Sequence, residues 1–246
     1  ISNAVNAAGD GDTVLVSNGT HAITAAIDVT KNLAIRGLGG NPSNVVVDAG
    51  GLCRGFFISG TTNALLSGLT VQHGSNSLYG GGAYIYSSTI TLTNSSVAYN
   101  LATGSLTDGR GGGMYVNNSS LTLDNTQVHD NAAGTSGGGI RLYNTSTLNL
   151  LNGSELYNNM DTSGDGAALA VSGSGDLQIN VSDASFYQNT ASGSGGAIDL
   201  RGTGILSFTG AWDLHHNTAG IDGGALAIYD TADAQFHNGP GYFSYN

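Results

Sequence analysis

Short runs of alternating apolar and polar residues follow one another along most of the chain, and three signatures recur within them in a fixed order. Each unit opens with small residues that lead into an alternating strand, continues with an apolar pair two residues apart, and closes with apolar-x-x-Asn. Alternation over four to eight residues is typical of a half-buried β-strand. The small-residue runs begin at Gly81, Gly111, Gly137, Gly166, Gly195 and Gly223.

The asparagine that closes each unit gives the period of the repeat. It stands at Asn100, Asn131, Asn159, Asn189, Asn217 and Asn246, with spacings of 31, 28, 30, 28 and 29 residues. Repeats of this length usually form a solenoid, because one unit cannot bury its apolar face alone and stacks on its neighbours. We expect each asparagine to lie at a turn and to bond both the backbone and the equivalent asparagine of the next coil, as a structural ladder.

Three strands per repeat suit a coil with three β-faces, and hairpin signals such as Asn-Gly are too sparse for an antiparallel sandwich. The sequence therefore predicts an all-β fold, a right-handed single-stranded parallel β-helix of about eight coils. Residues 80–246 carry the regular repeats, residues 13–79 form irregular coils, and residues 1–12 form a cap. Ile1, Ala4, Val5 and Ala8 share one helical face, which predicts a short capping helix.

Composition narrows the possible partners. Six Lys and Arg stand against 17 Asp and Glu, and the net charge of -11 disfavours nucleic acid and anionic lipid. The chain has no run of 18 consecutive apolar residues, so the sequence predicts no membrane span. Cys53 is the single cysteine, which we expect to be a small buried apolar residue, and we expect no metal or other cofactor.

The same composition bears on location. A chain that is acidic, poor in lysine and rich in Asn, Ser and Thr is typical of secreted bacterial proteins, so we expect an extracellular or cell-surface location. The chain begins without an initiator methionine and stops within a repeat, and we expect it to be part of a longer array.

Several segments resemble known β-helices. Residues 33–37, 45–51 and 66–71 resemble the opening coils of the pectate-lyase-like right-handed β-helix superfamily. Gly-Gly-Ala-Ile at 195–198 and Phe-x-x-Asn at 186–189 resemble the repeats of chlamydial polymorphic outer membrane proteins and related bacterial surface adhesins. The resemblance covers nearly the whole chain and implies the fold. It implies no single activity, because lyases, hydrolases, phage tailspikes and adhesins share this fold.

The positions between the apolar residues are expected to face solvent. The candidate glycan-binding residues among them are Tyr84, Tyr86, Tyr115, Arg141, Tyr143, Asp199 and Arg201. Exposed tyrosine rings beside charged groups offer surfaces on which sugar rings stack and hydrogen-bond. The alternative is that tyrosine simply suits a half-exposed strand. The asparagine motif adds a second outward set, Tyr99, His129, Tyr157, Tyr187, His215, His216 and Tyr245.

Catalytic machinery is harder to assemble from the sequence. A β-helix lyase needs a base and a cation on neighbouring coils, and a glycosidase needs two carboxylates. Asp199 and Asp130 fall in different columns. Asp108 and Arg110 could approach Arg141 and His129, but a solvated loop is the favoured interpretation. Residues 161–166 resemble a calcium loop only in part and are expected to form a solvated turn. We therefore predict no catalytic residues.

These observations favour a non-catalytic extracellular β-helix. It would act as the stalk or passenger domain of an adhesin, or as a filament subunit that assembles end to end, and would contact carbohydrate on a host or neighbouring cell surface. The alternative is a polysaccharide lyase or glycoside hydrolase of the pectate-lyase-like superfamily.

Overall fold

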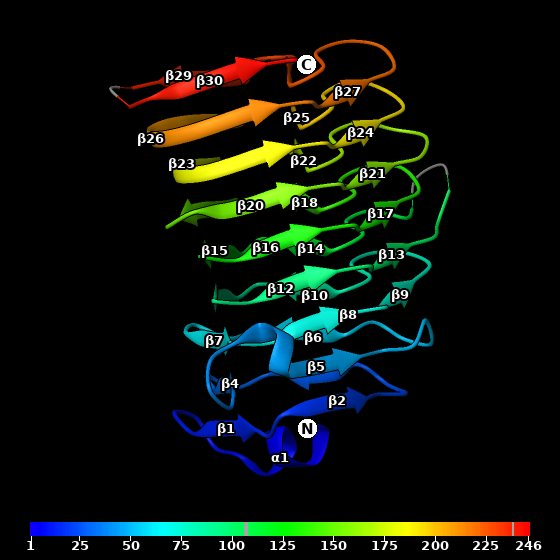
Figure 1. Ribbon diagram of the computed structural model, residues 1–246, viewed down its shortest axis with the longest axis vertical. Coiled ribbons are helices and arrows are strands. Elements are labelled where there is room, and N and C mark those ends of the chain that lie inside the picture. Colours follow the sequence, from blue (N-terminus) through cyan, green and yellow to red (C-terminus); the bar gives the residue numbers. More distant parts are fainter. Residues whose placement is uncertain (106–107, 238) are drawn as a thin grey trace.

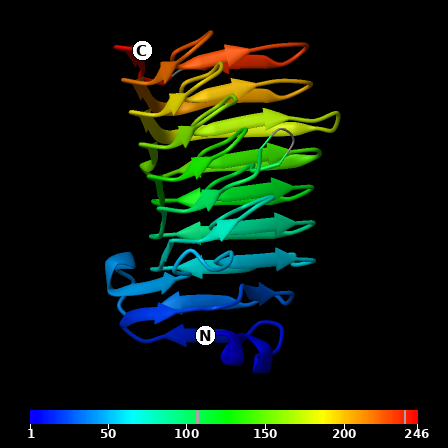
Figure 2. The same cartoon turned by 90° about the vertical axis from the view of Figure 1, so that its right-hand side faces the viewer.

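The computed structural model describes residues 1–105, 108–237 and 239–246, and it forms a parallel β-helix whose axis is vertical in Figures 1 and 2. Each coil pairs with the next through parallel strands, as in the register Ala83 to Met114 to Ile140. One sheet runs the length of the stack with eight strands, so the chain makes about eight coils. The all-β solenoid with a short N-terminal helix is confirmed.

The eight-stranded sheet takes one strand from every coil. It contains β3 (Ile27–Val29), β6 (Phe56–Ser59), β10 (Ala83–Tyr86), β14 (Met114–Asn117), β18 (Ile140–Tyr143), β22 (Leu169–Ser172), β25 (Ile198–Leu200) and β28 (Leu226–Ile228).

A sixteen-stranded sheet supplies the other two long faces. The first face contains β1 (Thr13–Val16), β4 (Ala34–Gly37), β7 (Ala64–Ser67), β11 (Thr89–Thr93), β15 (Ser120–Asp124) and β19 (Ser146–Leu151). The second, turned toward the viewer in Figure 1, contains β2 (Gly19–Ala22), β5 (Val45–Asp48), β8 (Thr70–Gln72), β12 (Ser96–Ala98), β16 (Gln127–His129) and β20 (Ser154–Tyr157). Two long strands run through both faces, β23 (Leu177–Tyr187) and β26 (Ile205–His215), and β26 also pairs with β29 (Asp233–Phe236) and β30 (Gly241–Ser244).

A fourth, short strand in most coils builds a separate six-stranded sheet. Its members are β9 (Ser75–Asn76), β13 (Leu101–Ala102), β17 (Ala132–Ala133), β21 (Met160–Asp161), β24 (Thr190–Ala191) and β27 (Thr218–Ala219). The expectation of three strands per coil missed these two-residue strands, because two residues are too few to show an alternation.

The core consists of apolar columns that run along the axis. Ile85, Val116, Leu142, Val171 and Leu200 occupy equivalent positions on successive strands, and all are fully buried. At the N-terminal end, helix α1 (Ser2–Ala7) packs against β3 and buries Val5. The 3₁₀ turn η1 (Pro42–Asn44) projects beside β5. Cys53 is only half-buried, so the expectation that it is a core residue is wrong.

The small-residue runs are explained by the turn that enters the eight-stranded sheet. Gly111 has a φ of +67° and Gly166 a φ of +68°, in the left-handed region that favours glycine. A Cβ on Gly111 would also collide with the carbonyl oxygen of Met114. In the first regular unit the equivalent residue is Gly80, with φ +63°, so this run begins one residue before Gly81.

The six repeated asparagines form a continuous hydrogen-bond ladder along the axis. Asn131 Oδ1 accepts from both the backbone N–H and Nδ2 of Asn100, each at 3.0 Å. Asn131 Nδ2 in turn donates to the carbonyl of Val97 at 2.9 Å and to Asn159 Oδ1 at 3.1 Å. The same set of bonds continues through Asn189, Asn217 and Asn246. The first five members are at most 1% exposed, so the ladder satisfies turn groups that water does not reach.

Within the described ranges, no helix has the length and apolar character needed to cross a bilayer.

We expect Asn159→Ala to destabilise the fold strongly. The substitution leaves the buried backbone N–H of Asn131 without its partner and removes the side-chain hydrogen bonds to the carbonyl of Val128 and to Asn189. Each such buried group costs about 1–3 kcal/mol, so urea denaturation should show a loss of about 3 kcal/mol or more. Asn180→Ala is the matched control, because the Asn180 side chain donates a 2.9 Å hydrogen bond to Asn149 Oδ1 on the half-buried outer side of the coil. Its loss should stay below about 1 kcal/mol, and equal losses in the two variants would contradict a special role for the ladder.

Candidate functional site

The outer face of the eight-stranded sheet brings the candidate residues together in two adjoining regions. Strand register places Tyr84 beside Tyr115 and Tyr115 beside Arg141, all with side chains on the outer side. The tyrosine patch consists of Tyr79, Tyr84, Tyr86, Tyr115 and Tyr143. The arginine cavity is lined by Arg110, Thr135, Ser136, Arg141, Asp165, Ser172, Asp199 and Arg201.

The rings of the tyrosine patch hold one another in place. Tyr84 and Tyr115 meet edge to face with centroids 5.3 Å apart, and Tyr79 lies 4.6 Å from Tyr115. The guanidinium of Arg54 lies 5.2 Å from the centre of the Tyr84 ring, and its Nε donates to the carbonyl of Gly80 at 2.8 Å. Tyr86 is 41% exposed, while Tyr84 and Tyr143 are half-buried. The patch therefore offers fixed aromatic surface to solvent.

Three of the candidate residues are not at the surface. The alternation predicts exposure for Tyr115, Arg141 and Asp199, but they are only 3%, 6% and 1% exposed. The reason is an additional column of residues that precede the small-residue runs. Backbone bridges link Tyr79, Arg110, Ser136 and Asp165 from coil to coil, and this column covers the outward side of the sheet. Burial also raises the pKa of Tyr115 to about 12.

The arginine cavity has a volume of about 160 Å³ and concentrates positive charge. Of the six Lys and Arg in the chain, three line it, namely Arg110, Arg141 and Arg201. Arg201 bridges two carboxylates, with Nε 2.7 Å from Asp199 Oδ2 and Nη2 2.7 Å from Asp165 Oδ2. Its guanidinium also lies 4.5 Å from the centre of the Tyr229 ring. Arg201 is therefore fully engaged by its neighbours.

Arg141 has a different environment. Its Nη2 donates to Ser172 Oγ, but its Nε has no hydrogen-bond partner. Among the described residues it makes no ion pair. Burial, together with the nearby charge of Arg110, lowers its pKa to about 10. The cavity thus contains a buried guanidinium whose charge no carboxylate neutralises directly.

Two buried carboxyl groups have strongly raised pKa values. Burial raises the pKa of Asp199 to about 6, although Arg201 opposes the shift. Burial raises the pKa of Asp161 to about 7, although hydrogen bonds from the backbone N–H groups of Gly164 and Ser163 to its Oδ1 lower the pKa. Asp161 is 1% exposed, so the expectation of a solvated turn at 161–166 is wrong for this residue, although Thr162 and Ser163 are exposed. The carboxylate closes this turn from inside, and its Oδ2 is left without a partner.

Sequence reasoning missed Asp165 as a partner of Asp199. The available signal was its position, since Asp165 directly precedes a small-residue run, as Arg110 and Ser136 do in other units. Arg110 and Arg141 line the same cavity, so the approach that the sequence left as the less favoured alternative to a solvated loop is found for this pair. His129 lies instead on β16 in another sheet, where its Nδ1 is 2.7 Å from Asp130.

Four members of the second outward set form a stacked column on the face turned toward the viewer in Figure 1, while Tyr99 meets His129 edge to face and His216 pairs with Tyr245. His129, Tyr157, Tyr187 and His215 follow one another with centroids 4.7, 4.8 and 5.1 Å apart and ring planes within 6° of parallel. Because these rings cover one another's faces, solvent reaches mainly their edges. A sugar ring cannot stack on them, which argues against this aromatic column as the glycan site.

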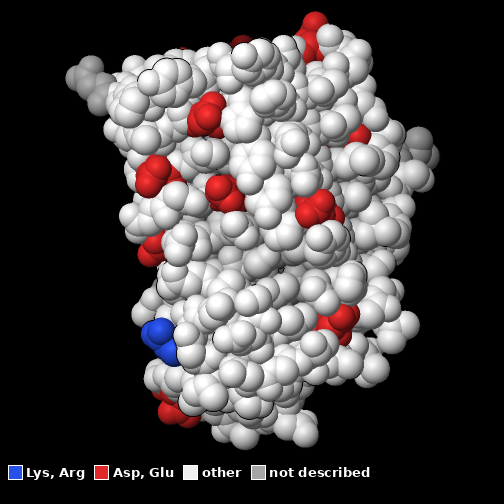
Figure 3. Space-filling view, viewed as in Figure 1, with Lys and Arg blue, Asp and Glu red and all other residues white. Residues whose placement is uncertain are grey.

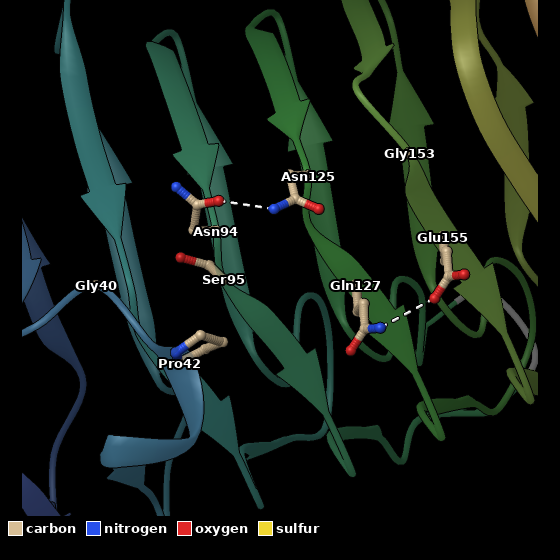
Figure 4. Close-up of a pocket in the computed structure, with 8 residues that line it drawn as sticks. All are labelled: Gly40, Pro42, Asn94, Ser95, Asn125, Gln127, Gly153 and Glu155. Carbon is tan, nitrogen blue, oxygen red and sulfur yellow. Dashed lines mark hydrogen bonds between the residues drawn. The ribbon is translucent and has the colours of Figure 1, made fainter.

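A groove of about 400 Å³ lies on the same side of the molecule, beside η1. Figure 4 shows that its polar side chains bond to one another across coils, Asn125 to Asn94 at 2.7 Å and Gln127 to Glu155 at 2.9 Å. Acidic groups are scattered over this side, and positive charge is visible only toward its N-terminal half (Figure 3). Because these side chains pair with one another, the groove offers few free polar groups to a ligand.

Histidine and acidic side chains do not gather into a metal site in the described part of the chain, where no group of three or more His, Cys, Asp or Glu is suitably placed.

The raised pKa values predict that stability falls as pH rises. The folded state holds the Asp161 proton up to about pH 7, whereas the unfolded chain releases it near its ordinary pKa of 3.8. The stability from this group is complete below pH 3.8 and lost as pH rises through about 7. Asp161→Asn keeps the oxygen acceptor and cannot ionise, so its free energy of unfolding should fall less over this range. Urea denaturation across pH measures the slope, with exposed Asp176→Asn as the control. An unchanged slope in Asp161→Asn would contradict this assignment.

The comparisons with known proteins concern the fold. The family model described as a right-handed β-helix region matches residues 54–239, which include both the tyrosine patch and the arginine cavity. A search of the curated proteins and a search of the solved structures found no match. The match covers well over half of the chain and agrees with the stacked parallel coils. The chain therefore belongs to the right-handed β-helix family.

Proposed function

We propose that this chain is a non-catalytic extracellular β-helix that forms the stalk or passenger domain of a surface adhesin and contacts glycans through the tyrosine patch. The observation that carries the proposal is a cluster of contiguous rings on one sheet face, with Tyr86 41% exposed at its margin. Ring surface with neighbouring polar groups suits the apolar faces and hydroxyls of sugars.

The support of the patch favours binding. Tyr84 and Tyr86 both lie on β10, and Arg54 and Tyr115 hold Tyr84 from two sides. A ligand that stacks on rings fixed in this way pays little conformational entropy to order them. The acidic, lysine-poor composition and the likeness of the repeats to those of bacterial surface proteins support an extracellular location. The partner is then carbohydrate on a host or neighbouring cell.

A second candidate function rests on the carboxylates of the arginine cavity. Asp199 and Asp165 share Arg201, and a carboxyl group with a pKa raised to about 6 beside a second carboxylate is the pattern of a glycoside hydrolase. Access argues against it, because Asp199 is 1% exposed and the cavity holds only about 160 Å³. A polysaccharide does not reach Asp199 in this arrangement.

The binding proposal is tested on a glycan array with the purified chain. We expect specific retention on some glycans, and Tyr86→Ala should weaken it by about tenfold, the loss expected for one aromatic contact of about 1.4 kcal/mol. Tyr157→Ala, in the aromatic column on another face, is the matched control and should bind as the parent does. Retention unaffected by Tyr86→Ala would reject the patch as the binding surface.

The catalytic alternative is tested by product release from the same glycans. We expect no release of sugar fragments by the parent chain. Turnover that disappears in Asp199→Asn, while Tyr86→Ala retains it, would replace the adhesin proposal with a hydrolase.

A further inference from the structure

Arg141 is the starting point, because its charge is buried without an ionic partner. Arg141 is only 6% exposed, and its Nε has no hydrogen-bond acceptor. No carboxylate among the described residues lies within ion-pair distance of its guanidinium. An uncompensated buried charge is strongly unfavourable, and folded proteins normally pair it or neutralise it. A guanidinium stays protonated at neutral pH, so neutralisation does not resolve the imbalance.

The groups around Arg141 do not remove this imbalance. The carboxylates of Asp165 and Asp199 are held by Arg201, each at 2.7 Å. Arg110 adds a second guanidinium to the same cavity, and its charge disfavours the charge on Arg141. The hydroxyl of Ser136 also lines the cavity, and its buried Oγ has no partner. Two residues that line the cavity, Arg141 and Ser136, therefore have polar atoms without partners, and three guanidinium groups face two carboxylates there.

We propose that the arginine cavity binds the carboxylate group of an organic acid, with Arg141 as its principal partner. A planar carboxylate matches the planar fork of a guanidinium and receives two parallel hydrogen bonds from it. Arg110 supplies further positive charge and Ser136 a further donor. The volume of about 160 Å³ holds about five waters at about 30 Å³ each, or a carboxylate with a few attached atoms. This site adjoins the tyrosine patch, since Arg141 lies 5.7 Å from the centre of the Tyr143 ring, but it does not depend on the proposed glycan contact at Tyr86.

The acidic neighbours select a monoanion over phosphate and make binding depend on pH. The charged and titratable groups around Arg141 are Arg110, Arg201, Asp161, Asp165, Asp199, Tyr115 and Tyr143. Asp199 and Asp161, with pKa values of about 6 and about 7, take up protons as the solution becomes mildly acidic. Protonation removes their repulsion of an incoming anion, so affinity for a carboxylate should rise as pH falls from 7 toward 5.5.

Calorimetric titration at constant ionic strength tests the site with acetate, glucuronate, phosphate and chloride as probes. We expect saturable binding of one carboxylate per chain, at least tenfold tighter at pH 5.5 than at pH 8, and no saturable binding of phosphate. Acetate binding more tightly than glucuronate identifies a small free acid as the ligand. The reverse order identifies the carboxyl group of a sugar acid.

Variants at position 141 separate a ligand site from a structural arginine. Arg141→Met should abolish carboxylate binding and raise the melting temperature in carboxylate-free buffer, because it removes an unpaired buried charge. Arg141→Lys keeps the charge without the planar fork and should bind at least tenfold more weakly; it also serves if the Met variant does not fold. Arg36→Met removes an exposed arginine on β4 and should match the parent.

Three results would overturn the proposal. Equal binding of chloride, phosphate and acetate would mean an adventitious ion only, and absent binding would mean that water alone fills the cavity. Binding that survives unchanged in Arg141→Lys would place the ligand elsewhere. Tyr86→Ala should leave carboxylate titrations unaltered, so the failure of glycan binding and the failure of carboxylate binding remain distinct.

Discussion

A coil of this protein buries its apolar side chains only against the coils directly before and after it, so coil-to-coil register constrains every other feature. Parallel pairing keeps that register from β1 and β4 at one end to β26 and β30 at the other. A slip by one residue would turn core side chains such as Leu142 outward. The asparagine ladder reinforces the register, because each amide fits only the turn of its own neighbour. Between β23 and β26 a difference in repeat length is taken up by a register shift after Val181, within the strands themselves.

The same register arranges the outer surface in columns. Coils about 4.8 Å apart bring equivalent outward side chains to stacking distance, and the rings from His129 to His215 follow at 4.7 to 5.1 Å. On the eight-stranded sheet the columns contain unlike residues, Tyr84 beside Tyr115 and then Arg141. Unlike neighbours leave rings tilted and charges incompletely paired. The candidate binding surfaces therefore lie on the eight-stranded sheet, where the outward residues of successive repeats differ.

The sequence predicted what periodicity encodes. Alternation placed Ile85 and Leu142 in the core, and the spacing of Asn100 and its equivalents marked the turns. The burial of Arg141 and Asp199 was not predictable in this way. Both residues are covered by the column of Tyr79, Arg110, Ser136 and Asp165. These four residues share a position in the repeat but no residue type, so the sequence pattern did not predict the column. Asp161 was misjudged because a polar turn in sequence gives no sign of which carboxylate points inward.

The direction of the hydrogen bonds has a mechanical consequence. Strands lie across the long axis of the molecule, so the bonds that join successive coils run along it (Figure 1). A pull on the two ends therefore loads one coil junction at a time instead of shearing many strands together. Each junction has its own set of core contacts, and from Asn100 onward each also has its own asparagine pair. Under tension such a rod would peel apart coil by coil, lengthening in steps of about one repeat and absorbing work gradually.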